Sequence, residues 1–88
     1  MTAVQRRKRI KEIGQDLLAR MRARFPLVEL LETEDRPAGT IAYHVYVPYE
    51  DVFEVLDATG NRVVELAADE NLIVLIIPHS QKPLHQAA

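Results

Sequence analysis

The sequence predicts a small α+β domain with the element order helix, strand, strand, helix, strand. Two helices would accompany a three-stranded mixed sheet. Three observations predict this class. Apolar side chains recur at helical spacing over residues 5–25, and they alternate along residues 40–47. Residues 72–77 are six consecutive apolar residues that stop at Pro78, which is typical of a strand covered on both faces.

The first helix is expected over residues 5–25, where one side of a helical wheel is apolar. That side consists of Ile10, Ile13, Leu17, Met21 and Phe25. Gly14 lies on the same side and costs up to ~1 kcal/mol of helix propensity relative to alanine. We therefore expect Gly14 to permit a close backbone contact. Pro26 ends the helix, because the residue before a proline is pushed out of the helical region.

The next two elements are predicted to form an antiparallel hairpin. Residues 27–33 are the first strand, although Leu30 and Leu31 interrupt its alternation. Residues 34–39 contain proline and glycine and are expected to form the turn. The second strand, residues 40–47, places Ile41 and its alternate neighbours on one face.

Residues 50–68 admit two interpretations. Six side chains gather within an arc of roughly 100° on a helical wheel, which favours a helix kinked near Gly60. They are Val52, Val55, Leu56, Thr59, Val63 and Leu66. The alternative is a hairpin that turns at residues 58–61, where glycine and asparagine are adjacent.

A right-handed crossover through this helix would place the strand at residues 72–77 parallel to the strand at residues 40–47. With three strands, the apolar strand must then lie at an edge of the sheet. Such an edge promotes aggregation unless it is covered. The simplest cover is a second copy, so we expect a homodimer formed by edge pairing or by packing of sheet faces.

Length and composition limit the other possibilities. The chain has 88 residues, which suits one domain at residues 1–80 followed by a flexible tail at residues 81–88. It contains no cysteine, so neither a disulfide nor a thiolate metal site is expected. The longest apolar run has six residues, against roughly 20 needed to span a bilayer. We expect a cytoplasmic protein that does not insert into a membrane.

The net charge of −2 conceals an asymmetry. Residues 1–25 contain eight basic and two acidic residues, a charge of +6, whereas residues 26–88 contain three basic and eleven acidic residues, a charge of −8. The basic cluster Arg6, Arg7, Lys8, Arg9 and Lys11 could contact nucleic acid through its phosphates. The interpretation we prefer is that the basic helix matches acidic residues of its own fold or of its neighbour.

The sequence contains no recognised pattern of reactive groups, so we predict no catalytic residue, no cofactor and no metal site. Three glycines do not make a phosphate-binding loop, and Ser80 is the sole serine. The acidic residues at 29–35 are interpreted as a solvated strand face and turn. A ligand-binding neighbourhood is expected where the carboxyl ends of the two parallel strands meet. Its candidate residues are Tyr46, Tyr49, Asp51 and His79.

The element order over residues 8–78 is similar to the core of the small nucleotidyltransferases. In that family a Gly-Ser pair follows the first strand, and two aspartates two positions apart bind magnesium. Near the first place this chain has Glu34 to Gly39, near the second it has Tyr43 to Val45, and no Asp-x-Asp pair occurs. The resemblance implies a degenerate, non-catalytic relative that could still bind a nucleotide.

These observations predict a small, non-catalytic, homodimerising interaction or regulatory module, with a second protein as a further partner. Two alternatives stay open. One is a ligand- or nucleotide-binding domain, and the other is nucleic-acid contact through the basic first helix.

Overall fold

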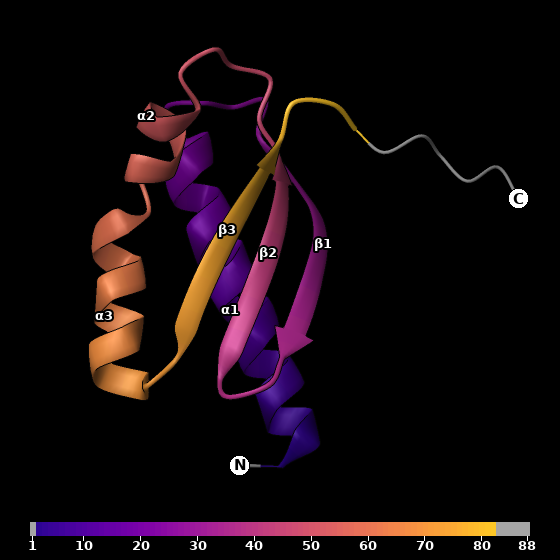
Figure 1. The fold of residues 1–88 in the computed structure, drawn as a ribbon, viewed down its shortest axis with the longest axis vertical. Helices are drawn as coiled ribbons and strands as arrows, with labels where there is room; N and C mark the ends of the chain where they lie inside the picture. Colours follow the sequence, from indigo (N-terminus) through magenta and orange to yellow (C-terminus); the bar gives the residue numbers. More distant parts are fainter. Residues whose placement is uncertain (1, 83–88) are drawn as a thin grey trace, which may run out of the picture.

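A three-stranded sheet forms one layer of the protein and helices form the other, in a computed structural model that describes residues 2–82 (Figure 1). The elements in chain order are α1 (Ala3–Arg22), β1 (Glu29–Arg36), β2 (Thr40–Tyr46), α2 (Val52–Asp57), α3 (Gly60–Glu70) and β3 (Ile73–His79). The predicted α+β class and element order are confirmed, except that the expected second helix is divided into α2 and α3.

The sheet has the order β1-β2-β3, with β1 antiparallel and β3 parallel to β2. The predicted hairpin, the crossover and the edge position of the apolar strand are therefore confirmed.

The expected boundaries of the first strand and its turn were wrong. Arg36 pairs with Thr40, so the loop holds only residues 37–39, and it closes because Ala38 and Gly39 both adopt positive φ (61° and 72°). A register shift between Leu30 and Glu32 accounts for the interrupted alternation of β1.

Helix α1 passes behind the sheet (Figure 1) and is held against it by its apolar side. Ile13 and Leu17 are buried there. The close contact expected at Gly14 is confirmed, because a Cβ atom at this position would lie 2.8 Å from Cε1 of Tyr43. The Tyr43 hydroxyl donates a hydrogen bond to the Ile10 carbonyl oxygen at 2.6 Å. Burial raises the pKa of Tyr43 to about 12, so this hydroxyl stays protonated.

Residues 50–68 form helices rather than a hairpin, with a break at Ala58 and Thr59. The Asp51 side chain accepts a hydrogen bond from the Glu54 N–H at 3.0 Å and begins α2. At the break Thr59 is buried, and its hydroxyl donates to the Leu56 carbonyl oxygen at 2.7 Å. The break near Gly60 allows the apolar side of each short helix to face the sheet.

All described helices pack on one face of the sheet. Ile41, Tyr43 and Val45 of β2 point into this layer, where they pack with buried side chains of α1, α2 and α3. The opposite face is open, and it carries the alternate residues of the strands. Within residues 2–82 the helices cover one face of the apolar strand, so cover on its other face would have to come from a partner chain.

The two remaining expectations concern insertion into a membrane and the tail at residues 81–88. None of the helices within residues 2–82 is long and apolar enough to cross a bilayer. The predicted flexible tail lies, from residue 83 onward, outside the described residues.

Candidate functional site

The open face of β3 presents an apolar strip made of Ile73, Leu75 and Ile77. Ile73 is 53% exposed and Leu75 is 39% exposed. β3 contains no lysine, arginine, aspartate or glutamate, and the register places Leu75 beside the small side chain of Ala42 on β2. The strip is therefore an apolar surface, and its side chains carry no charge that would repel the same strip of another copy.

The outer edge of β3 carries backbone groups that point away from β2. The Ile73 N–H donates to the Gly39 carbonyl oxygen, and the His79 carbonyl oxygen accepts from the Val47 N–H, both at 2.9 Å. Because peptide groups alternate along a strand, those of Val74, Ile76 and Pro78 face outward. No described strand lies beyond β3. Proline lacks an N–H, so Pro78 adds no unpaired donor to this edge. The edge is thus able to accept another strand along Val74 to Ile76.

A polar group, which we call the histidine cluster, lies at the carboxyl end of the same face and consists of Glu34, His44 and His79. His44 Nδ1 and His79 Nε2 are 2.8 Å apart, and His44 Nε2 is hydrogen-bonded to the Glu34 carboxylate. This hydrogen bond is the main reason that the pKa of Glu34 lies below its ordinary value. The His44 side chain is only 17% exposed. The two imidazoles line a hollow of about 370 Å³ together with Leu31 and Glu32.

The structure separates the four residues expected to bind a ligand into two pairs. Tyr46 is the register partner of His79, so Tyr46 lies on the open face next to the histidine cluster, of which His79 is a member. Tyr49 instead packs edge-on against Phe25, with ring centroids 5.0 Å apart, and its hydroxyl accepts from the Leu27 N–H at 3.1 Å. Asp51 caps α2. Tyr49 and Asp51 therefore have structural roles on the other side of the sheet.

His44 and Glu34 were not among the site residues predicted from the sequence. The alternation of residues 40–47 does place His44 on the same face as Tyr46. The missing information was that β3 continues through His79, since the apolar run stops before Pro78. Only the parallel register shows that two histidines 35 positions apart come together.

Two members of the predicted basic cluster are paired with acidic residues of the chain itself. Arg6 donates through Nε and Nη2 to the Asp35 carboxylate, at 2.9 and 2.7 Å. Arg9 donates through the same two nitrogens to the Glu70 carboxylate. These hydrogen bonds lower the pKa of Asp35 and of Glu70. The remaining members, Arg7, Lys8 and Lys11, are exposed. The pairs match the preferred interpretation of the charge asymmetry.

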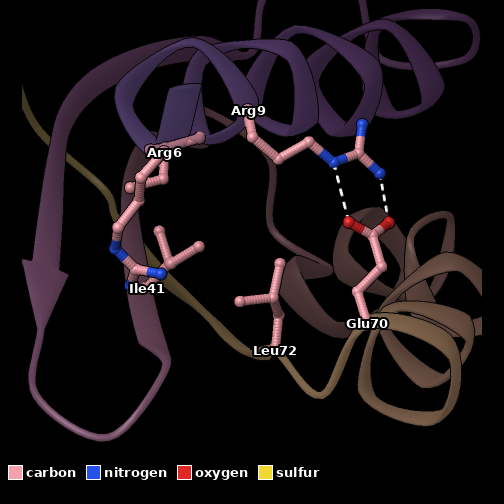
Figure 2. Close-up of a pocket in the computed structure, with 6 residues that line it drawn as sticks. Arg6, Arg9, Ile41, Glu70 and Leu72 are labelled. Atoms are coloured by element: carbon pink, nitrogen blue, oxygen red, sulfur yellow. Dashed lines mark hydrogen bonds and ion pairs between the residues drawn. The ribbon is translucent and has the colours of Figure 1, made fainter. Parts of the chain in front are cut away.

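A pocket of about 300 Å³ lies between α1, β2 and the end of α3 (Figure 2). Its floor is apolar, from Ile10, Ile41 and Leu72. The Arg9 guanidinium reaches from α1 to Glu70 beside it, as Figure 2 shows. Because Arg6 and Arg9 are each satisfied by a carboxylate, the lining supplies no unmatched charge to hold an ionic ligand. We therefore interpret the pairs as ties between α1 and the rest of the fold.

A scan against protein-family models, a search of curated proteins and a search of solved structures each found no match. The resemblance to nucleotidyltransferases accordingly stays a prediction. Within residues 2–82, no group of three or more histidine, aspartate or glutamate side chains is arranged to hold a metal ion.

Proposed function

We propose that this chain is a self-associating interaction module whose β3 strand pairs with β3 of a second copy. The observation that carries the proposal is the exposed apolar strip on an edge strand, with Ile73 53% and Leu75 39% exposed. Edge strands of this kind are normally shortened, charged or covered. Here the strand has seven residues and no lysine, arginine, aspartate or glutamate, and Pro78 protects only its last part. A partner strand would cover the outward-facing peptide groups of Val74 and Ile76.

A second copy suits this edge because the edge is complementary to itself. In an antiparallel pair around a twofold axis at Leu75, Val74 of each copy would exchange backbone hydrogen bonds with Ile76 of the other. The two Leu75 side chains would then meet across the axis. Ile73 of each copy would lie opposite Ile77 of the other, which joins the two apolar strips into one surface.

The other edge of the sheet offers no such surface. The open face of β1 carries Glu32, Glu34 and Arg36, and ionic groups must lose hydration when they are buried. The charge distribution therefore directs association to β3.

The test compares two lysine substitutions by sedimentation velocity over a micromolar-to-millimolar concentration series. Leu75→Lys places two ammonium groups against each other at the axis, where like charges are destabilising, so we expect the dimer to be lost. Val64→Lys is the matched control, because Val64 is an apolar residue 68% exposed on α3, away from the strip. It should dimerise like the wild type.

Circular dichroism shows whether each variant is folded. Ile73→Lys provides a second disruption at a more exposed position if Leu75→Lys does not fold. A wild-type chain that stays monomeric throughout the series would overturn the proposal. So would equal dimerisation of the Leu75→Lys and Val64→Lys variants.

A further inference from the structure

We propose that His44 and His79 bind one divalent transition-metal ion, with Zn²⁺ as the representative. The proposal rests on the histidine cluster, and not on self-association. His44 Nδ1 and His79 Nε2 are 2.8 Å apart and approach from two neighbouring strands of the open face. Imidazole nitrogens are good ligands for Zn²⁺, Ni²⁺ and Cu²⁺.

Glu34 prepares His44 for this role. When the carboxylate accepts the proton on His44 Nε2, the neutral ring has its lone pair on Nδ1, which is the nitrogen directed at His79. Metal-binding histidines usually donate their other N–H to a carboxylate or carbonyl, which fixes the tautomer and the ring orientation. Glu34 is therefore a positioning residue rather than a ligand.

The distance between the two nitrogens is close to that of a metal-bound pair. Two Zn–N bonds of about 2.0–2.1 Å in a tetrahedral arrangement hold their nitrogens about 3.3 Å apart. With His44 Nδ1 as the acceptor, His79 Nε2 is the donor of the hydrogen bond between the rings, so His79 would carry its proton on Nδ1 instead when the ion binds. The rings would also separate by about 0.5 Å and turn so that both lone pairs face the ion.

The remaining coordination positions can be filled from the same hollow. Glu32 lines it, and its Cα is the register partner of His44. Turning the Glu32 side chain toward the two histidines would supply a third ligand, and water would occupy the last position. A site of this type binds the ion in a solvent-accessible position, at the end of the sheet where β2 and β3 terminate.

No metal site was predicted from the sequence, because His44 and His79 are 35 positions apart in the chain. His79 also lies four positions beyond Leu75, the residue proposed to meet its own copy at the dimer axis. Metal binding and dimerisation can therefore be tested separately, and the Leu75→Lys variant should bind the metal as the wild type does.

The experiment titrates the full chain, without an affinity tag, with Co²⁺ followed by visible absorption and with Zn²⁺ followed by calorimetry. We expect saturable binding of one ion per chain, which is lost in His44→Gln and in His79→Gln. His85→Gln is the matched control, because it removes the chain's third histidine, and it should bind like the wild type. Glu34→Gln should weaken binding by about 10- to 100-fold, as loss of such a supporting carboxylate usually does.

Long-range ¹H–¹⁵N spectra provide a readout that a purely structural role would not change. They should identify His44 Nδ1 and His79 Nε2 as the nitrogens shifted by Zn²⁺, while circular dichroism confirms that each metal-free variant is folded. Absence of saturable binding in the wild type would overturn the proposal. So would binding that survives His44→Gln or His79→Gln, or that disappears in His85→Gln.

Discussion

Replacing Gly14 by alanine tests how closely α1 approaches the sheet. The added Cβ would lie 2.8 Å from Cε1 and 3.4 Å from Cδ1 of the Tyr43 ring. The ring has little freedom to move, because Tyr43 is 2% exposed and its hydroxyl is bonded to the Ile10 carbonyl oxygen. The substitution therefore forces α1 away from the sheet or the ring out of its position.

Two opposing effects determine the change in the free energy of unfolding. Alanine improves helix propensity by up to ~1 kcal/mol relative to glycine. Inserting an atom into a well-packed core typically costs about 1–3 kcal/mol. We expect the steric cost to exceed the gain, with a net destabilisation of about 1 kcal/mol, which lowers the Tm by about 4–8 °C for a domain of this size.

The measurement is thermal unfolding of the wild type, Gly14→Ala and Gly60→Ala at one protein concentration. Gly60 is the matched control, since a Cβ there would come no closer than 4.0 Å to Asp57 Oδ1. Its replacement should leave the Tm unchanged or raise it. In a Tyr43→Leu background, which removes the atoms in the way, Gly14→Ala should become neutral or stabilising.

A Gly14→Ala variant that is more stable than the wild type would contradict the close packing. It would mean that helix propensity outweighs the contact with Tyr43. An unchanged effect in the Tyr43→Leu background would likewise show that the ring is not the cause.

Two other predictions concern the ends of helices and the ion pairs. Asp51→Ala removes the acceptor for the Glu54 N–H and should reduce the free energy of unfolding by about 1 kcal/mol in urea titrations, whereas Asp51→Asn should retain it because asparagine caps equally well. For the ion pairs, hydrogen bonds from arginine hold the pKa of Asp35 and Glu70 below their ordinary values, so the unfolded chain takes up these protons at a higher pH than the folded chain. Their contribution to stability should be complete above about pH 4.5 and should be lost as the pH falls through the lowered folded values. A urea midpoint that does not fall on acidification would contradict this, and Glu70→Gln should show a weaker dependence than the wild type.

Much of the fold could be predicted from local patterns. The alternation of residues 40–47 and the helical spacing of residues 5–25 depend on the pleat of a strand and the turn of a helix, which are properties of the chain itself. Gly14 on an apolar helix face was enough to predict a close contact. The element boundaries were less predictable. The three-residue turn depends on the positive φ of Ala38, which a sequence pattern does not reveal.

The candidate sites depended on long-range pairing. Tyr46, Tyr49, Asp51 and His79 were grouped because the strands were expected to end together. Two side chains after β2 instead turn to the helical side, where Tyr49 contacts Phe25 and Asp51 caps α2. Strand ends can be placed from a pattern, but the direction of a side chain in the following loop depends on its tertiary contacts.

By itself, the sequence determined the elements, their order and the apolar character of the last strand, because these follow from the chemistry of neighbouring residues. The tertiary structure decided which face of that strand stays open and which residues meet across it. His44 and His79 come together through a register set by the packing of helices on a single face of the sheet, and such packing joins residues that are far apart in the chain.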